Sequence, residues 1–348
     1  MSTGYLVGTG QNPYVGQDLG AVFHHIGFRS LTTVGYPPPW PLALGFLYRV
    51  VHAITPSLLV YNLAIKLPVI AANVALAYLV GAVLKNLGAD PAATRRAWVF
   101  LLLNPFLLYF GAAWGQIDAI VALLSLAALV LLTRERRDGS AGLLALSIAV
   151  KPTALPILPV ALVYLAGRSF RQAVRYAAVF GVGVVVFGVL PFAVFGWDPT
   201  AVVRHLNAHF VMTGTMSFMT VVRLFRDPLL MQGHWWLLGL LWIPALAVAT
   251  VVALRRGVGG FDDLVKKSTA LLLVFFLTRT WLAEPNVILI LPLVLILTSL
   301  AVFARYEPTT LLVRAALVIA WQSAGWWIVA SCFRRVPASS ARGPVEWS

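Results

Sequence analysis

The chain has 348 residues, of which 60% are hydrophobic and 11% are charged, and its formal net charge is +14. A soluble domain is about 45 to 50% apolar and about 25% charged, so this composition excludes a soluble fold. The basic residues lie in short loops between apolar runs rather than on one polar helix or tail, so they do not indicate nucleic-acid binding. The composition therefore predicts a single transmembrane domain over residues 1–348.

The first 59 residues contain no apolar run of the length, about 20 residues, that a membrane-spanning helix needs. Three consecutive prolines end directly before Trp40, and the stretch Trp40–Ile54 is expected to form a helix with proline in its first turn. We expect this helix to lie along the membrane interface with Arg49 and His52 facing outward. Residues 1–59 are interpreted as a non-cytoplasmic loop.

Residues 60–331 are predicted to form a helical bundle with about eight full spans, followed by a polar tail over residues 332–348. Several spans are short, which indicates tilted helices or local thinning of the membrane. The expected spans are Tyr61–Val83, Ala97–Ala113, Ile117–Leu132, Tyr176–Phe195, Trp235–Leu254, Thr269–Trp281, Val287–Phe303 and Leu311–Ala330.

One more apolar stretch, Ala141–Ala166, contains Lys151, Pro152 and Pro156 near its middle. Two prolines and a charge favour a broken helix over a continuous span. If the stretch turns back as a hairpin, the arginines that follow it lie on the same side as most other basic loop residues; a single crossing would separate them. We therefore predict an all-α polytopic bundle with a proline-broken hairpin, oriented with its basic loops in the cytoplasm.

On the opposite, non-cytoplasmic face lies the segment "WGQID", which contains Trp114, Gln116 and Asp118. Inserting an acidic side chain at the membrane centre costs about 2.5 to 3.5 kcal/mol of free energy. The position of Asp118 beside an apolar run therefore indicates a structural or functional role. One interpretation is an N-cap, in which the carboxylate accepts backbone N–H groups of the next helix. The other is a catalytic role for Asp118 at a site for a hydroxyl-rich ligand, with Gln116 as a polar partner and Trp114 as an aromatic platform. The two are compatible.

Two cations are candidates for binding a phosphate. Lys151 lies far from either end of its apolar run, which favours phosphate binding in a cleft over snorkelling to the interface. Arg279, in "TRTWLAEPN", can present its planar guanidinium to a phosphate or pair with Glu284. Glu284 precedes Pro285 and can simply open the next helix.

The remaining acids and histidines give weaker signals. Asp18 lies on a polar loop, where most acids are solvated. His205 and His209 are four residues apart but lack a third ligand, and Cys332 is the only cysteine, so we predict no metal site and no cofactor.

Five segments, in order, carry a family resemblance: "GTGQNPY", "GYPPPWPLALGFLYRVV", "LLLNPFLLYFGAAWGQIDAIVALLSLAALVLL", "AGLLALSIAVKPTALPILPVAL" and "TRTWLAEPNVILILPLVLIL". Together they resemble the polytopic glycosyltransferases of the GT-C superfamily, most closely the mannosyltransferase-like members. The resemblance implies transfer of a hexose, mannose being expected, from a polyprenyl or dolichyl monophosphate to a glycolipid or glycan acceptor. The transfer would occur with inversion at the non-cytoplasmic face of the cell membrane. Tyr36, in the second segment, is a further predicted substrate-binding residue.

In the family, a carboxylate in the first outer loop takes the proton of the acceptor hydroxyl, and cations hold the lipid phosphate. That carboxylate follows a first span that this chain lacks ahead of "NPY", so Asp18 is the only acid left in the loop. Three alternatives stay open: Asp18 is the base, the recorded start omits the amino terminus, or the chain is inactive or works with a small partner that supplies the span. A transporter or lipid flippase is the competing class of function, because broken helices and intramembrane charges also mark transport pathways.

Overall fold

The structure is a computed structural model that describes residues 1–19, 30–31, 34–203, 214–215, 240–279 and 281–303. The chain divides into one unit from Met1 to Phe303, which contains all described residues, and a second unit from Ala304 to Ser348. The predicted span Leu311–Ala330 and the tail 332–348 therefore lie outside the described residues. The described regular structure is helical, as predicted, apart from two pairs of two-residue strands.

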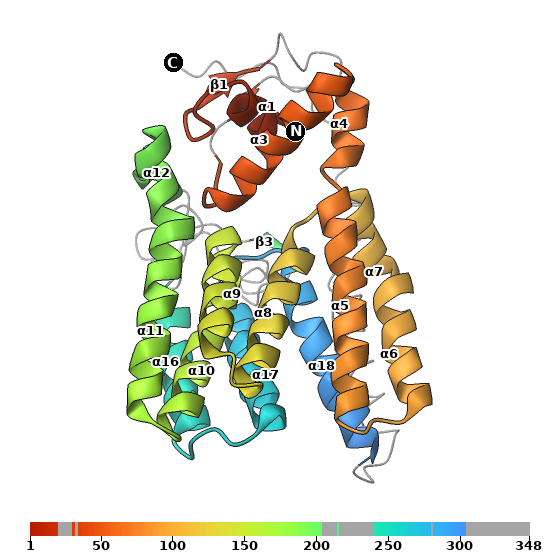
Figure 1. The fold of residues 1–348 in the computed structure, drawn as a ribbon, viewed down its shortest axis with the longest axis vertical. Helices are drawn as coiled ribbons and strands as arrows, with labels where there is room; N and C mark the ends of the chain where they lie inside the picture. The colour runs from red at the N-terminus through yellow and green to blue at the C-terminus, as the bar shows by residue number, and fades with distance from the viewer. Residues whose placement is uncertain (20–29, 32–33, 204–213, 216–239, 280, 304–348) are drawn as a thin grey trace, which may run out of the picture. The chain divides into compact units, whose positions relative to one another are not determined.

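The N-terminal elements, drawn in red and orange in Figure 1, include a helix that agrees with the prediction and one that the sequence did not indicate. The predicted helix is α3, whose first residue is Pro39 and in which Arg49 and His52 are both exposed, as expected. The unexpected helix is α1, within the predicted loop. The elements are α1 (Ser2–Gly8), β1 (Gln17–Asp18), β2 (Ser30–Leu31), α3 (Pro39–Ile54) and α4 (Leu58–Ala64), and β1 pairs antiparallel with β2.

Close packing against α3 explains why α1 is helical, since a seven-residue helix is marginal by itself. Each helix has a glycine at the contact, where there is no room for a side chain. A Cβ on Gly45 of α3 would lie 2.3 Å from Val7 Cγ1, and a Cβ on Gly8 of α1 would lie 2.3 Å from Tyr48 Cδ1. The Arg49 Nε donates a hydrogen bond to the Gly8 carbonyl oxygen at 2.8 Å. Tertiary contact, not local propensity, therefore determines this helix.

Gly45→Ala should separate α1 from α3, because the added methyl group overlaps Val7 and overpacking costs about 1 to 3 kcal/mol. We expect faster proteolysis of the first residues and a lower unfolding temperature. The matched control is Gly81→Ala, where the nearest atoms to a new Cβ are 3.9 Å away. That variant should be neutral or more stable by about 0.5 to 1 kcal/mol, because alanine is the better helix former. Equal proteolysis of the two variants would contradict the close contact.

The helical bundle follows from α5 onward (Figure 1). Its first part contains α5 (Leu67–Asn86), α6 (Pro91–Leu103), α7 (Pro105–Leu107), the π-helix η2 (Leu108–Ala113), α8 (Asp118–Thr133), α9 (Arg137–Val150), the 3-10 helix η3 (Pro152–Ala154) and α10 (Ile157–Ala166). Its second part contains α11 (Phe170–Val184), the π-helix η4 (Val185–Val189), α12 (Leu190–Phe195), β3 (Gly214–Thr215), α16 (Trp242–Leu254), α17 (Phe261–Thr278), β4 (Trp281–Leu282), the 3-10 helix η6 (Glu284–Asn286) and α18 (Val287–Phe303). Strands β3 and β4 pair in parallel.

Three helical stretches within the described part of the chain are long and apolar enough to cross a membrane: Leu58–Asn86, Pro91–Ala113 and Phe170–Phe195. They correspond to the predicted spans that begin at Tyr61, Ala97 and Tyr176, and each starts earlier than predicted. Shorter apolar helices occupy Asp118–Thr133, Ile157–Ala166, Trp242–Leu254 and Glu284–Ser299, and the predicted span Thr269–Trp281 falls largely on α17. A membrane protein is supported, whereas the total of about eight spans stays a prediction.

The broken stretch Ala141–Ala166 has the predicted hairpin form. Helix α9 ends at Val150, Lys151 is extended with φ −157° and ψ 123°, and α10 begins at Ile157 after a 3-10 turn. The chain then returns to the end of the bundle where α9 began. The evidence is a two-pronged ion pair between Arg175, near the start of α11, and Asp138, near the start of α9. The turns before and after the hairpin therefore lie on the same side.

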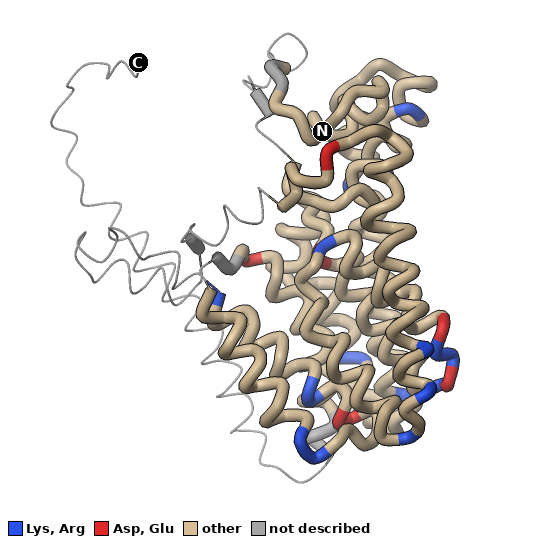
Figure 2. The backbone as a smooth tube through the Cα atoms, turned by 90° about the vertical axis from the view of Figure 1, so that its left-hand side faces the viewer, with Lys and Arg blue, Asp and Glu red and all other residues tan. Residues whose placement is uncertain are grey.

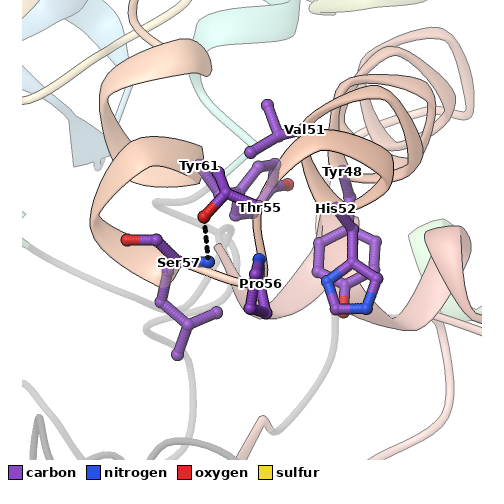
Figure 3. A pocket seen from close by; sticks show the side chains of 8 residues that line it. Tyr48, Val51, His52, Thr55, Pro56, Ser57 and Tyr61 are labelled. Carbon is purple, nitrogen blue, oxygen red and sulfur yellow. Dashed lines mark hydrogen bonds between the residues drawn. The ribbon is translucent and has the colours of Figure 1, made fainter.

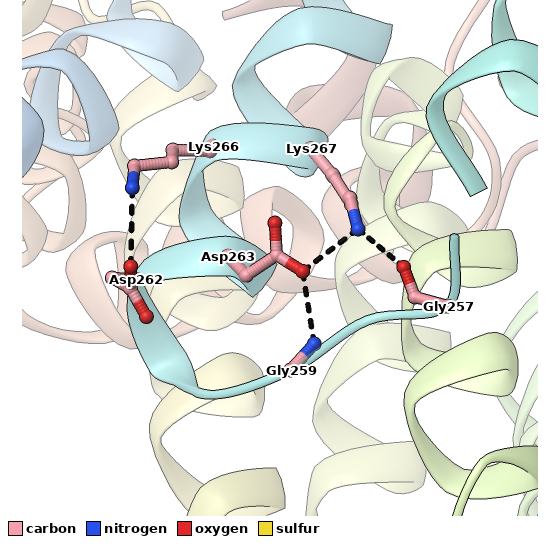
Figure 4. Close-up of polar contacts among 6 residues, drawn as sticks. All are labelled: Gly257, Gly259, Asp262, Asp263, Lys266 and Lys267. Atoms are coloured by element: carbon pink, nitrogen blue, oxygen red, sulfur yellow. Dashed lines mark hydrogen bonds and ion pairs between the residues drawn. The ribbon is translucent and has the colours of Figure 1, made fainter. Parts of the chain in front are cut away.

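The turn between α16 and α17 is held by a second set of polar contacts, shown in Figure 4. The Asp263 carboxylate accepts from the Gly259 N–H at 2.9 Å and from Lys267 Nζ at 2.7 Å, and Lys267 also donates to the Gly257 carbonyl. Burial raises the pKa of Asp263, but these hydrogen bonds and the charges of Lys267 and Lys266 lower it by more, so the net shift of the pKa is downward.

Asp263→Asn should destabilise the folded protein by about 1 kcal/mol at pH 7, because it removes a charged acceptor from the start of α17. A carboxyl whose folded-state pKa is lowered stabilises above its ordinary pKa of 3.8, and this contribution disappears as pH falls through the folded-state value. The difference between variant and wild type in unfolding experiments should therefore narrow below about pH 4. Asp262→Asn is the matched control: its pair with Lys266 is exposed, so we expect a change within about 0.5 kcal/mol. If the difference in free energy of unfolding between Asp263→Asn and wild type did not depend on pH, the stabilising role of the Asp263 carboxylate would be contradicted.

Candidate active site

The N-terminus of α8, the C-terminus of α9 and the end of η6 meet around one buried cation. The Lys151 Nζ donates to Asp118 Oδ1 and to Asn286 Oδ1, each at 2.7 Å. Asp118 is completely buried, Asn286 is 4% exposed, and the Lys151 side chain is 13% exposed. The structure thus places two predicted site residues, Asp118 and Lys151, in direct contact. We call Asp118, Lys151 and Asn286 the polar triad.

The antiparallel packing of α8 on α9 explains why this contact forms. Ser125 on α8 and Ser147 on α9 are hydrogen-bonded at 2.9 Å, and Ser147 Oγ donates to the Val121 carbonyl at 3.1 Å. The short turn after Thr133 joins the two helices, so the residue that begins α8 lies beside the residue that follows α9. Pro152 prevents α9 from continuing and leaves Lys151 extended at this level.

The triad corrects both simple interpretations of these residues. Asp118 does not act as an N-cap, because Ile117 occupies the cap position and no side chain caps α8. Lys151 does not snorkel, because its ammonium group bonds within the bundle. An ammonium has three donors, and two are used here, so one is left for a ligand. Asp118 Oδ2 is buried and has no hydrogen-bond partner within the described structure, so it can accept a further bond.

Arg279 follows the last residue of α17 and has no acidic partner among the residues that the structure describes. Its guanidinium carbon lies 5.0 Å from the centroid of the Phe275 ring. The hypothesis that Arg279 pairs with Glu284 is therefore not supported. Glu284 opens the 3-10 helix η6, with Pro285 in its first turn, as the alternative interpretation predicted. Among the described residues, none pairs with the planar fork of Arg279, so it is suited to bind an anion.

Trp114 and Gln116 lie in the turn between η2 and α8. Trp114 is 57% exposed and stacks on Phe110, with ring centroids 5.5 Å apart and an interplanar angle of 21°. The Gln116 N–H donates to the Phe110 carbonyl at 2.8 Å, and its side chain is partly exposed. Gly115 between them has φ +80°, a left-handed conformation that favours glycine. The turn therefore presents an aromatic face and an amide beside the start of α8.

Tyr36 and Asp18 belong to the segment that precedes the bundle. The Tyr36 carbonyl accepts a hydrogen bond from the Tyr14 hydroxyl at 2.9 Å, and its ring packs against the bundle core and against the cluster that contains Tyr14 and Trp197. Asp18 lies in β1, with Ser30 as its partner in β2. No contact in the described part of the chain joins either residue to the polar triad, so their roles stay predictions.

Three predicted site residues, Asp118, Lys151 and Arg279, share one end of the helices with Asn286. Asp118 starts α8, Lys151 follows α9, Arg279 follows α17, and Asn286 precedes α18. The turns α5–α6, α10–α11 and α16–α17 lie at the other end, at the bottom of Figure 1, and most of the Lys and Arg residues in Figure 2 are found there. This separation is what the predicted orientation requires.

The hollow in Figure 3 does not compete with this site. It lies between α3 and α4 and is lined by Tyr48, His52 and Tyr61 among others, and it leaves no space for a water molecule. His52 stacks on Tyr48 at 5.2 Å, and the Ser57 N–H donates to Thr55 Oγ1 at 3.3 Å. Within the described structure, no three His, Cys, Asp or Glu side chains are grouped to hold a metal ion. Metal independence nevertheless stays a prediction.

Residues 36–285 match the sequence model of glycosyltransferase family 87, which covers well over half of the chain. The chain belongs to glycosyltransferase family 87. The match places the protein among the GT-C-type membrane glycosyltransferases, as the sequence resemblance predicted, and supports a transferase over a transporter. A search of curated proteins and of solved structures finds no significant match.

The family 87 match extends over most of the candidate site. It contains Tyr36, Asp118 and Lys151 and ends at Pro285, directly before Asn286, whereas Asp18 precedes it. Asn286 was not among the predicted site residues. Its signal in the sequence was its position directly after Glu284 and Pro285, in a turn predicted to lie on the same face as Asp118; buried charges there require hydrogen-bond partners.

Proposed function

We propose that this family 87 protein transfers a hexose, mannose being the expected sugar, from a polyprenyl or dolichyl monophosphate to a glycolipid or glycan acceptor. The reaction takes place at the non-cytoplasmic face and inverts the anomeric configuration. The polar triad carries the proposal. Its charges lie at the end of the bundle opposite the basic turns. Among the described residues, one donor of Lys151 and one oxygen of Asp118 have no partner.

Arg279 is suited to the donor phosphate. A lipid monophosphate is an anion, and a guanidinium with no acidic partner among the described residues can bind two of its oxygens in parallel. Lys151 attracts the phosphate less strongly than Arg279 does, because the carboxylate of Asp118 offsets its positive charge. Its third N–H can still donate to a phosphate oxygen or a sugar hydroxyl. Gln116, Trp114, Glu284 and Tyr36 are proposed to line the sugar and acceptor positions.

The proposed chemistry is a single displacement. The acceptor oxygen forms a bond to the anomeric carbon, the bond from that carbon to the phosphate oxygen breaks, and the lipid phosphate leaves with the electron pair. A carboxylate takes the acceptor proton, and the leaving phosphate needs no acid because cations stabilise its charge. Asp118 is completely buried and bound to Lys151, so Asp18 is the better candidate base, and Asp118 positions Lys151.

The test is transfer by the purified chain in lipid vesicles with radiolabelled polyprenyl-phosphate mannose, the matching glucose donor and a nucleotide-linked sugar. We expect a labelled, inverted product from a lipid-linked donor only, with activity retained in a metal chelator. Transfer from the nucleotide sugar alone, or uptake of solute without transfer, would overturn the proposal. Activity of the purified chain alone would exclude a required small partner. Asp18→Asn should lower turnover by about 10² to 10⁴-fold. The matched control Asp90→Asn, which removes a charge at the basic end but keeps a side chain that can cap α6, should stay active.

A further inference from the structure

A groove of about 470 Å³ lies at the opposite end of the bundle from the polar triad. The turn between α8 and α9 and the first turns of α11 form its walls. Its charged lining residues are Glu135, Arg136, Arg137, Asp138, Arg171 and Arg175. The proposed transferase chemistry uses none of these residues, so the groove needs a separate explanation.

Pairing inside the groove leaves two arginines without acidic partners. Both oxygens of Asp138 are bound by Arg175, and Glu135 Oε2 lies 3.6 Å from Arg137 Nη2. Within the described part of the chain, Arg136 and Arg171 form no ion pair, and both are exposed. They come from different elements, the α8–α9 turn and α11. The groove therefore presents an excess of positive charge from two sides.

The backbone of the turn also departs from the usual pattern. Glu135 has φ 61° and is the one described residue other than glycine with positive φ. The Glu135 N–H donates to the Leu132 carbonyl and the Arg136 N–H to the Leu131 carbonyl, a helix ending that normally places glycine at this position. A glutamate here costs about 1 to 2 kcal/mol, and such strain is concentrated at functional sites. The strained turn places the Glu135 side chain 3.6 Å from Arg137, at the edge of the groove.

The outer face of α11 is suited to a lipid. Phe170 is 76% exposed and Val174 is 52% exposed, and they are one helical turn apart, directly beside Arg171 and Arg175 with the same spacing. This face begins the apolar stretch Phe170–Phe195, so acyl chains can lie along it while a headgroup reaches the arginines. The polar residue Gln172 also lines the groove.

We propose that the groove binds the headgroup of an anionic phospholipid, with the phosphate between Arg136 and Arg171 and the acyl chains along α11. Basic pockets between transmembrane helices at the cytoplasmic side are suited to acidic headgroups. A soluble phosphate would use the arginines but not the apolar face of α11. A glycerol headgroup adds hydroxyls that can form hydrogen bonds with the polar side chains that line the groove.

Binding of short-chain phosphatidylglycerol to the purified full chain in neutral detergent tests the proposal, with native mass spectrometry and thermal unfolding as readouts. Phosphatidylcholine of the same chain length and inorganic phosphate are the comparison probes. We expect phosphatidylglycerol to bind and to raise the unfolding temperature, and the other two to do neither. The double variant Arg136→Gln/Arg171→Gln should bind at least roughly tenfold more weakly, as expected for loss of charged hydrogen bonds.

The matched control is Arg255→Gln/Arg256→Gln, which removes two exposed charges from the α16–α17 turn at the same end. It should bind phosphatidylglycerol like the wild type. Without lipid, both double variants should unfold at the wild-type temperature, because all four side chains are exposed. A second variant, Val174→Ser, should lower the affinity for phosphatidylglycerol without changing the charge of the groove. The assignment would be overturned if the two double variants lost the same affinity for phosphatidylglycerol, or if inorganic phosphate bound as tightly as the lipid. Sugar transfer is a separate readout, so failure here leaves the proposed function untouched.

Discussion

Lys151→Met should lower the free energy of unfolding by about 3 to 5 kcal/mol, because it leaves the carboxylate of Asp118 buried without its cation. Asn286 loses its donor in the same variant. The measurement is chemical unfolding of the purified protein in detergent. Lys266→Met is the matched control: its pair with Asp262 is exposed, so the change should stay within about 1 kcal/mol. Equal stability of the two lysine variants would show that the triad is not a buried ion pair.

A double variant separates stability from chemistry in the triad. Lys151→Met/Asp118→Leu removes both charges together, and a buried ion pair replaced by apolar residues is often as stable as the original. We therefore expect the double variant to recover most of the stability that Lys151→Met loses. Sugar transfer should stay low, because the free donor of Lys151 and the free oxygen of Asp118 are both gone. Recovery of transfer together with stability would make the triad purely structural.

Arg279→Gln should lower kcat/KM for the lipid-linked donor by about 10² to 10³-fold, the effect of removing one group that stabilises charge in the transition state. Stability should be unchanged or higher, because Arg279 has no acidic partner in the described part of the chain and contacts the Phe275 ring. Loss of activity without loss of stability is the expected signature of a cation kept for a ligand. The measurement is steady-state transfer at varied donor concentration.

Two further variants determine whether Arg279 binds the phosphate. Arg279→Lys keeps the charge but loses the planar fork, so it should be intermediate, with a raised donor KM. Arg256→Gln removes an exposed arginine at the other end of the bundle and should transfer sugar like the wild type. If the rate of transfer by Arg279→Gln depends on donor concentration as it does in the wild type, the guanidinium serves only to pack against Phe275.

The sequence could have predicted the pairing of Lys151 with Asp118. The turn between α8 and α9 is centred near residue 135, and residues at similar distances on either side, such as Ser125 and Ser147, lie opposite each other. Asp118 and Lys151 are also nearly equidistant from that turn. Combined with the rule that buried charges are paired, the predicted hairpin places the two side chains together. The involvement of Asn286 required the tertiary structure, because it is 135 residues from Lys151.

By itself, the sequence determined the class of protein, the helical bundle, the broken hairpin and the face on which the unusual polar residues gather. These features follow from composition and from periodicity along the chain, which are local properties. Only the tertiary structure decided that α1 is a helix, that Asp118 bonds to Lys151 instead of capping α8, and that Arg279 does not pair with Glu284. Each of those outcomes depends on which side chains meet across helices, and packing between distant segments sets that.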